Sequence, residues 1–321
     1  MNPLTCAQAL AAARALGLDR LDAQLLLLHA LGKPANARAW LLAHDTDALT
    51  EEAARQFAAL SQRRAAGEPL AYIVGSKEFF GLALQVDSRV LVPRPDTETL
   101  VQWALDLLQV PASGAPQTEV SETLEVLEVP GVPPLQVLDL GTGSGAVALA
   151  IAHSLQAAGR PARLLAVDAS TDALAVARTN AERLGLAVQF LESSWLQEVS
   201  GRFDLIASNP PYIASADPHL AALTHEPLSA LTAGADGLDD IRQIIAQAPI
   251  HLQPGGWLLL EHGYDQAAQV RELLTRQGFG RVQSRRDLAD IERCSGGQWL
   301  GGPAPRQEMP AATSARHLTQ G

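Results

Sequence analysis

The chain has 321 residues, of which 47% are hydrophobic and 18% charged, and its formal net charge is −11. This length suffices for one large domain or two ordinary ones, and the acidic excess argues against a protein that grips duplex DNA through its phosphates. Only two cysteines are present, Cys6 and Cys294, and no cysteine and histidine cluster has the spacing of zinc ligands. We therefore expect neither a disulfide framework nor a metal site.

The sequence offers no candidate for a membrane segment. Its longest aliphatic run, residues 25–28, is far shorter than the roughly 20 apolar residues of a membrane-spanning helix. The first residues also lack the basic start and apolar stretch that typify a secretory signal peptide. We expect a cytoplasmic protein that does not contact membranes.

The first part of the chain has a helical pattern throughout. Thr5 and Thr50 are typical N-cap residues, and each precedes a run with helical periodicity. Two more helices are predicted after Arg20 and over ARAWLLAH, and the last of the four ends at Gly67. We predict a small N-terminal helical domain over residues 1–70, with no catalytic residues of its own.

The pattern then changes to β-like runs from Ile73 to Val92, with Gly75 and Gly81 as turn positions. We predict a β-hairpin linker over residues 71–92. A proline-bounded loop, PRPDTE, then leads into an amphipathic helix. The following residues, 110–134, are rich in proline and glutamate and are predicted to form a solvated surface excursion.

After Pro134, apolar strands alternate with amphipathic helices at a spacing typical of a parallel sheet covered by helices on both faces. Strands are predicted over LQVLDL, ARLLAVDAS, AVQFLES, FDLIASN and GWLLLEHG, and further strands near RVQSRRDL. We assign residues 93–305 to one catalytic domain. The polar residues 306–321 have no periodicity and are predicted to be a disordered tail.

A glycine-rich loop follows the first of these strands and opens a helix, and it consists of Gly141, Thr142, Gly143, Ser144 and Gly145. Glycines allow a tight turn and a close approach to a ligand, which meets free backbone N–H groups at the helix N-terminus. Asp168 ends the next strand, about 20 residues further on, where a carboxylate can bind ribose hydroxyls. The combination favours a nucleoside-bearing cofactor, although Asp168 could also serve as a helix-capping or turn residue.

A second motif stands at the end of the fourth predicted strand and reads Asn209, Pro210, Pro211 and Tyr212. Asn209 offers a side-chain carbonyl, and Pro210 a backbone carbonyl on a stiff turn. Two convergent acceptors suit a substrate –NH2 group. A proline-rich turn with an asparagine cap would explain the first three residues, but less well the aromatic residue that follows.

These motifs together resemble a known family. PRPDTE, the glycine loop and NPPY, in this order, are similar to those of the PrmC/HemK protein-(glutamine-N5) methyltransferases, and the resemblance extends over about residues 63–297. It implies a class I S-adenosylmethionine-dependent methyltransferase, with a Rossmann-like, mostly parallel seven-stranded sheet and a small N-terminal helical domain. The implied substrate is the glutamine of the GGQ motif in class I peptide chain release factors, and we expect a monomer that does not bind nucleic acid directly.

The resemblance also implies roles for the motif residues. Gly141 to Gly145 would line S-adenosyl-L-methionine, Asp168 would hold its ribose, and Trp195 would pack on its adenine. Asn209 and Pro210 would accept both hydrogens of the glutamine amide, and Tyr212 would border the substrate slot. Glu98 would face the cofactor pocket, although the N-terminal end of a helix dipole explains an acid at that position equally well.

The chain departs from the family pattern at two places. Ser194 stands where the family has an aspartate before Trp195, and residues 221–227 replace a GDVRFEP-like run. The tripeptide at 296–298 spells Gly-Gly-Gln, the same sequence as the substrate motif, and we interpret this as chance. These departures concern the adenine contact and the substrate loop.

Two other functions are consistent with parts of the pattern. NPPY-type motifs also serve adenine-N6 methyltransferases acting on DNA or RNA, because the adenine amine is a planar –NH2 as well. Such an enzyme would need basic residues around its pocket, and the sequence has no such cluster. A non-catalytic module that binds a nucleoside cofactor would have no need for paired acceptors at the methyl end.

Overall fold

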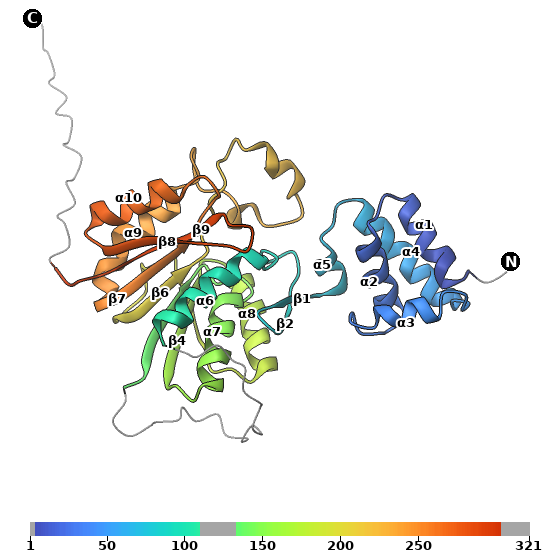
Figure 1. Ribbon diagram of the computed structural model, residues 1–321, viewed down its shortest axis with the longest axis horizontal. Helices are drawn as coiled ribbons and strands as arrows, with labels where there is room; N and C mark the ends of the chain where they lie inside the picture. The colour runs from blue at the N-terminus through green and yellow to red at the C-terminus, as the bar shows by residue number, and fades with distance from the viewer. Residues whose placement is uncertain (1–3, 110–132, 303–321) are drawn as a thin grey trace, which may run out of the picture.

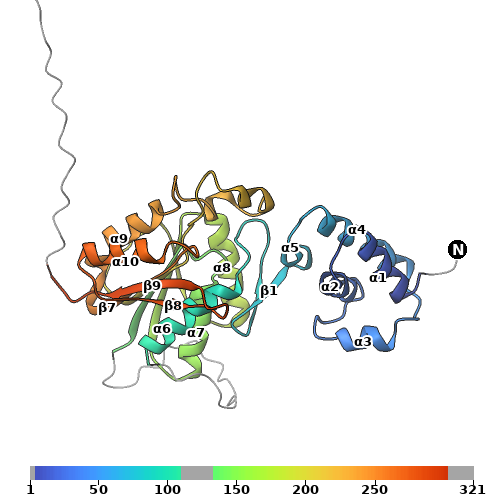
Figure 2. The same cartoon turned by 45° about the horizontal axis from the view of Figure 1, so that its top comes forward.

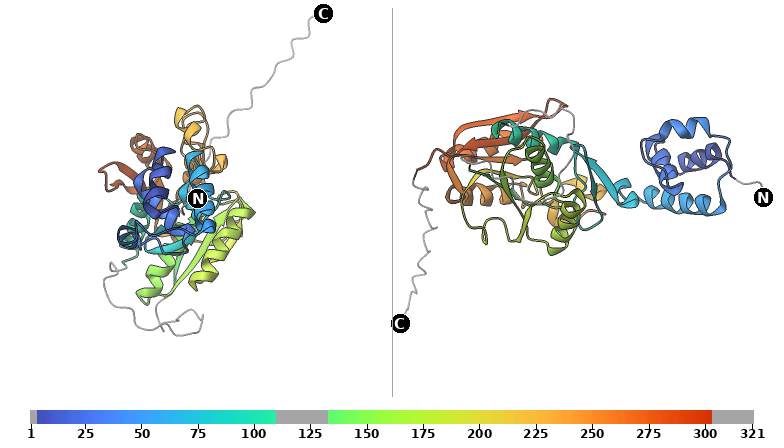
Figure 3. Two further views of the ribbon diagram at one scale, coloured as in Figure 1. Left: turned by 90° about the vertical axis from the view of Figure 1, so that its right-hand side faces the viewer. Right: turned by 90° about the horizontal axis from the view of Figure 1, so that it is seen from below.

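The computed structural model describes residues 4–109 and 133–302. A helical unit and a larger sheet-containing unit are joined by a β-hairpin, and Figures 1 and 3 show them side by side. The predicted tail at 306–321 lies outside the described residues, as does nearly all of the predicted excursion at 110–134. Within the described ranges, none of the helices has both the length and the apolar character needed to span a bilayer.

The helical unit contains four of the predicted helices. Its helices α1, α2, α3 and α4 span Cys6–Ala15, Arg20–Ala30, Arg38–Ala43 and Glu51–Ala65. The side chains of Thr5 and Thr50 accept backbone N–H groups of the first turns of α1 and α4, as their residue types predict. Apolar residues from all four helices form one buried cluster, so this unit has a core of its own.

The β-rich run predicted from Ile73 to Val92 is partly wrong. Residues Leu70–Val74 form a short helix, α5, because Ile73 packs into the helical core and Gly75 ends the helix with φ 73°. The hairpin itself consists of only β1 (Ser76–Phe79) and β2 (Leu82–Gln85). Residues 86–92, the rest of the predicted run, form no strand, and Val86, Val90 and Val92 are buried against helix α8 instead.

A seven-stranded sheet forms the second unit, which confirms the predicted α/β class. Its strand order is β5-β4-β3-β6-β7-β9-β8, and the first five strands are parallel whereas β9 is antiparallel to both neighbours. The strands β3 to β9 span Leu135–Leu140, Ala162–Asp168, Gln189–Glu192, Phe203–Ser208, Leu252–Glu261, Gly280–Arg286 and Glu292–Gln298.

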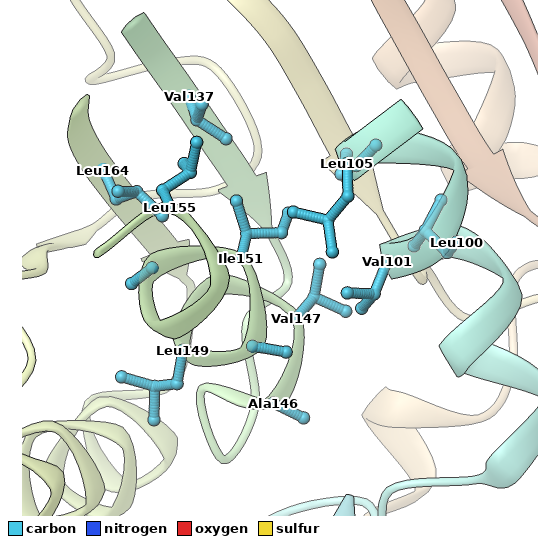
Figure 4. Close-up of a cluster of buried hydrophobic side chains, with 14 of the residues drawn as sticks. Leu100, Val101, Leu105, Val137, Ala146, Val147, Leu149, Ile151, Leu155 and Leu164 are labelled. Atoms are coloured by element: carbon cyan, nitrogen blue, oxygen red, sulfur yellow. The ribbon is translucent and has the colours of Figure 1, made fainter. Parts of the chain in front are cut away.

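Helices cover both faces of this sheet, because its central strands are apolar on both sides. The helices of this unit are α6 (Glu98–Leu107), α7 (Ala146–Ala157), α8 (Thr171–Leu184), α9 (Asp239–His251) and α10 (Ala267–Gln277). Val137 of β3 belongs to the cluster shared with α6 and α7, whereas its neighbour Leu138 belongs to the cluster shared with α9 and α10. Figure 2 shows the two helix layers, and Figure 4 shows Leu155 of α7 beside Val137 and Leu164 of the sheet, and Ile151 of α7 beside Leu105 of α6.

Strand β9 was not predicted, and it contains the Gly-Gly-Gln tripeptide. A Cβ atom on Gly296 would lie 2.6 Å from the carbonyl oxygen of Leu258, and one on Gly297 would lie 2.8 Å from Cβ of Phe279. Close packing within the sheet therefore requires both glycines. This packing gives the tripeptide a structural explanation that is independent of the substrate motif.

Candidate active site

The predicted site residues lie at one edge of the sheet. The glycine loop follows β3, Asp168 ends β4, Trp195 follows β5, and Asn209 to Tyr212 follow β6. These four parallel strands are adjacent in the order β5-β4-β3-β6, so their carboxyl ends meet. Ligands of open α/β sheets bind at this edge.

The glycine loop depends on backbone conformations that favour glycine. Gly141, Gly143 and Gly145 have φ values of 69°, 56° and 85°. A Cβ atom on Gly145 would lie 2.9 Å from Cδ1 of Leu149, so the loop also packs tightly against its own helix. The backbone N–H of Thr142 donates to the carbonyl of Val167 at 2.9 Å, which ties the loop to β4.

Asp139, on strand β3, is hydrogen-bonded to the glycine loop and to the first turn of α7. Its buried Oδ2 accepts hydrogen bonds from the Thr142 hydroxyl at 2.7 Å and from the backbone N–H of Ala148 at 3.1 Å. Burial raises the pKa of Asp139 to about 7, and the two donors oppose that rise. Asp139 is thus a structural anchor of the loop, a role that sequence analysis did not assign to it.

Asp168 connects the loop to the next strand. Its Oδ2 accepts the backbone N–H of Gly143 at 2.9 Å, and its Oδ1 accepts that of Ser170, also at 2.9 Å. Ser170, and not Asp168, is the N-cap of α8, so the capping explanation does not account for Asp168. Burial raises the pKa of Asp168, and each of its oxygens retains a lone pair for a further donor.

Trp195 lies against the glycine loop. A Cβ atom on Gly141 would lie 3.3 Å from its ring, and its Nε1 donates to Oδ1 of Asp240 in α9 at 3.0 Å. Its backbone φ of 52° is uncommon for a residue with a large side chain. A carboxylate therefore does accompany this tryptophan, although it comes from α9 and not from position 194.

Asn209 lies on the other side of the loop. The preceding Ser208 donates its hydroxyl to the carbonyl of Leu140 at 2.7 Å, which joins the ends of β6 and β3. Nδ2 of Asn209 donates to the hydroxyl oxygen of Thr97 at 3.1 Å. This bond directs the NH2 group of Asn209 toward Thr97, so Oδ1 lies on the opposite side of the amide, where a ligand can donate to it.

Tyr212 reaches a group that sequence analysis missed. Its hydroxyl donates to Oε1 of Glu261 at 3.3 Å, and burial raises the pKa of Tyr212. Glu261 is the last residue of β7 and is fully buried, and this burial raises its pKa to about 7. An acid at the carboxyl end of an apolar parallel strand could have indicated it from the sequence.

Glu98 lies in the first turn of a helix, as the dipole interpretation expects, and it also makes a contact that the sequence did not indicate. It is the first residue of α6, and its Oε1 accepts the backbone N–H of Phe80 at 3.1 Å. Phe80 stands in the hairpin turn with φ 50°, so this bond supports a strained turn. The Glu98 carboxylate holds the β-hairpin to the sheet unit.

The altered segment 221–227 is part of the connection between β6 and α9. This connection contains two short helices, η2 (Pro218–Ala222) and η3 (Leu228–Ala230). Oε2 of the buried Glu226 accepts the backbone N–H of Val92 at 3.1 Å, and its Oε1 pairs with Arg94. The segment is therefore fixed to the loop that precedes α6, despite its unusual sequence.

The described residues contain no candidate metal centre. Across residues 4–109 and 133–302, no group of three or more histidine, cysteine, aspartate or glutamate side chains could hold an ion. The site instead has Asp168 and the glycine loop on one side, and Asn209, whose amide is hydrogen-bonded to Thr97, on the other.

Comparisons with known proteins agree with this geometry. Residues 4–75 match the family model for the PrmC N-terminal domain, and residues 123–234 match that for the methyltransferase small domain. Among solved structures, the hMettl16 catalytic domain in complex with the MAT2A 3'UTR hairpin 6 has a TM-score of 0.52 at 16% identity, covering 76% of this chain and 83% of that chain. This last similarity concerns the fold alone.

Curated relatives extend the match to nearly the whole chain. The release factor glutamine methyltransferase of Burkholderia pseudomallei is 46% identical over 311 residues, which are 94% of this chain and 98% of that protein. The protein of the same name from Bordetella pertussis is 47% identical over 88% of this chain and 95% of its own length. The chain belongs to the release factor glutamine methyltransferase family.

Proposed function

We propose that this chain transfers the methyl group of S-adenosyl-L-methionine to the side-chain amide nitrogen (N5) of the glutamine in the GGQ motif of class I peptide chain release factors. The observation that carries the proposal is the fixed amide of Asn209, beside the glycine loop, in a chain 46% identical to a release factor glutamine methyltransferase. The exposed acceptor of that amide matches the –NH2 of a glutamine side chain.

The glycine loop and its neighbours fit the cofactor. A Cβ atom on Gly143 would meet no other atom within 4 Å, so open space lies beside the middle of the loop, and its φ of 56° favours glycine there. We assign the loop from Gly141 to Gly145, with Thr142, Gly143 and Ser144, to the methionine and ribose part, Asp168 to the ribose hydroxyls, and Trp195 to the adenine. When bound, the cofactor supplies an electrophilic methyl group on a sulfonium sulfur.

On the substrate side, Oδ1 of Asn209 and the carbonyl oxygen of Pro210 accept the two amide hydrogens, while Pro211 stiffens the turn and Tyr212 borders the slot. An amide nitrogen is a weak nucleophile because its lone pair is delocalised into the carbonyl. Two fixed acceptors orient the nitrogen toward the methyl carbon and favour its pyramidal form. The nitrogen would take the methyl group as the sulfonium becomes a neutral thioether, and the proton that the nitrogen then releases would pass to solvent.

The domain organisation suits a macromolecular substrate. We propose that the helical domain, residues 1–70, contacts the body of the release factor, and that the β-hairpin linker at 71–92 joins it to the catalytic domain at 93–305. His225 supports this arrangement, because its Nε2 lies 3.4 Å from the carbonyl oxygen of Ala66 at the end of the helical unit. A short glutamine peptide is then expected to be a poorer substrate than the whole release factor.

The remaining expectations concern the setting of the enzyme. We propose a cytoplasmic monomer that does not bind nucleic acid directly. The net charge of −11 supports the absence of nucleic-acid binding, and the free, buried thiols of Cys6 and Cys294 agree with a reducing compartment. Light scattering of the purified chain, with and without DNA, tests the monomeric state and the absence of DNA binding.

A methyl-transfer assay tests the proposed function. Purified class I release factor and adenine-containing DNA are offered in parallel with S-adenosyl-L-methionine, and mass spectrometry locates the added methyl group. Methylation of the release-factor glutamine would support the proposal. Methylation of adenine would overturn the substrate assignment, and transfer to neither would contradict the proposal and point to Ser194 and residues 221–227.

A further inference from the structure

Glu261 is a fully buried carboxyl beside the proposed substrate slot, and none of the steps above uses it. The cation whose charge acts on this carboxyl is Arg293, whose Nη2 lies 3.3 Å from Asp96 and whose Nε lies 3.1 Å from Asp287. Within the described part of the chain, Arg293 forms its ion pairs with these two aspartates and not with Glu261. A buried carboxyl without an ion-pair partner is costly, which indicates a role for it.

The Glu261 carboxyl contacts Tyr212, the last residue of the NPPY motif, and lies beside Thr97, which in turn binds Asn209, the first residue of the motif. The hydroxyl of Tyr212 donates to its Oε1 at 3.3 Å. The hydroxyl of Thr97 lies beside the same carboxyl and, as a hydrogen-bond donor, lowers its pKa. The contact with Thr97 is longer or less well aligned than a hydrogen bond. Among residues 4–109 and 133–302, the buried Oε2 of Glu261 has no hydrogen-bond partner.

Donor and acceptor types set the direction of the contacts that run from Glu261 through Thr97 to Asn209. An ionised carboxylate only accepts hydrogen bonds, so the hydroxyl proton of Thr97 is directed toward Glu261. The oxygen of Thr97 can then only accept from Nδ2 of Asn209, which it does at 3.1 Å. Asn209 consequently presents its Oδ1, and not its NH2, to the substrate.

We propose that Glu261 is a positioning residue for methyl transfer, which acts through the Thr97 hydroxyl to fix the amide of Asn209 with its oxygen toward the substrate amide. This inference rests on the proposed function, since it assumes that the acceptor of Asn209 meets a substrate –NH2. Glu261 itself does not need to contact the reacting atoms.

The Glu261→Gln variant tests this direction with almost no change in volume. A glutamine has one acceptor oxygen, which the Tyr212 hydroxyl uses, so its NH2 faces Thr97 and would reverse the Thr97 hydroxyl. Asn209 would then turn its NH2 toward the substrate NH2. We expect kcat to fall about 100-fold, the loss associated with a misplaced reacting group, with the KM for release factor and the Kd for S-adenosyl-L-methionine unchanged.

Glu292→Gln is the matched control. Glu292 lies on the neighbouring strand β9, is 34% exposed and pairs with Arg271 at 3.0 Å, away from the NPPY motif. Its substitution removes one acidic charge near the site without touching Thr97 or Tyr212. We expect its kcat to equal that of the wild type, and an equal loss in both variants would overturn the inference in favour of a general charge effect.

Variants of Thr97 test the route of the effect. Thr97→Val removes the hydroxyl, whereas Thr97→Ser retains it, so we expect a large loss of kcat in the first and near wild-type kcat in the second. The double variant Glu261→Gln, Thr97→Val should be no slower than Thr97→Val alone, because the chain of contacts is already broken. If the losses of kcat in the two single variants multiplied in the double variant, the inference would be overturned. If Glu261→Gln does not fold, the comparison of Thr97→Val with Thr97→Ser still tests the inference.

The pH dependence of kcat gives an independent measure. The pKa of Glu261 is raised to about 7 by burial, so the ionised form is lost as the pH falls through 7. The charged and titratable groups that face this carboxyl are Tyr212, Arg293, Asp96 and Cys294. We expect wild-type kcat to decline below pH 7, and this limb to disappear in Glu261→Gln.

The same experiments separate this inference from the proposed function. If the wild type fails to methylate release factor, the proposed function is wrong. If the wild type is active and Glu261→Gln retains its kcat within about twofold, only the role of Glu261 is wrong.

Discussion

The two halves of the site are built in different ways. The cofactor half is local in sequence, since Asp139 binds Thr142 three residues away and Asp168 binds Gly143 at a separation of 25. The substrate half joins distant segments, because Asn209 meets Thr97 at a separation of 112 and Tyr212 meets Glu261 at a separation of 49. A short motif therefore contains most of one half, whereas the ends of β6 and β7 and the start of α6 must come together to form the other.

This difference indicates how each half should respond to substitution. Backbone N–H groups and glycine conformations form most of the cofactor half, so single side-chain changes there should reduce affinity without abolishing chemistry. The substrate half relies on few side chains with fixed donor and acceptor directions. Single changes there should reduce turnover and spare cofactor binding.

The largest expected effect is that of Asn209→Ala. This change removes a fixed acceptor of the substrate amide, and the loss of one such preorganised polar group costs about 100-fold to 1000-fold in kcat. The Kd for S-adenosyl-L-methionine, measured by calorimetry, should stay near that of the wild type. Retained turnover, or a loss of cofactor binding equal to the loss of turnover, would contradict the division into two halves.

Asp168→Asn should give the opposite result. The substitution keeps the shape but replaces an ionised acceptor of ribose hydroxyls, and hydrogen bonds to charged groups contribute about 1.5–3 kcal/mol. We expect the Kd for S-adenosyl-L-methionine to rise about 10-fold to 100-fold, with kcat at saturating cofactor changed far less. An unchanged Kd would remove Asp168 from the cofactor half.

The buried Asp139 should make stability depend on pH. Its pKa in the folded state is about 7, above its ordinary value of 3.8, so folding favours the protonated form. This contribution is complete below pH 4 and is lost as the pH rises toward 7. We expect denaturant unfolding of the wild type and of Asp139→Asn to differ in slope across this window, by at most about 1.4 kcal/mol per pH unit, and parallel curves would contradict the raised pKa.

The smallest expected effect is that of Tyr212→Phe, which sharpens the comparison within the substrate half. The hydroxyl bond to Glu261 is long at 3.3 Å, so its loss should cost about 1 kcal/mol, or about fivefold in kcat. Thr97→Val should reduce kcat much more. If the two variants were equally slow, Tyr212 would orient the site as strongly as the Thr97 contact.

Prediction from the sequence succeeded where the determinants are local. The N-caps Thr5 and Thr50, the alternation of strands and helices, and the glycine loop between β3 and α7 all follow from residue type and periodicity. It failed at α5, where the start of a β-like run, Ile73 and Val74, is helical because both residues pack against the helical core. It also missed β9, whose two glycines gave no strand pattern and are required by packing.

The role of Glu98 shows the same limit on a smaller scale. The helix dipole and the resemblance each explained this acid, yet its carboxylate accepts the backbone N–H of Phe80 in the hairpin turn. No sequence pattern around residue 98 predicts its contact with residue 80. Two segments that meet only after folding define this contact.

Strand periodicity, glycine conformation and short-range spacing are properties of neighbouring residues, so the fold class, the family and the residues of the two motifs followed from the sequence. The contacts of Glu261 with Tyr212, Thr97 with Asn209, and Asp240 with Trp195 follow only from tertiary packing. The adjacency of β6 and β7 brings Tyr212 to Glu261, whereas the packing of α6 and α9 on the sheet brings Thr97 and Asp240 to the motif residues. The direction in which Asn209 presents its amide depends on that packing, and no local pattern encodes it.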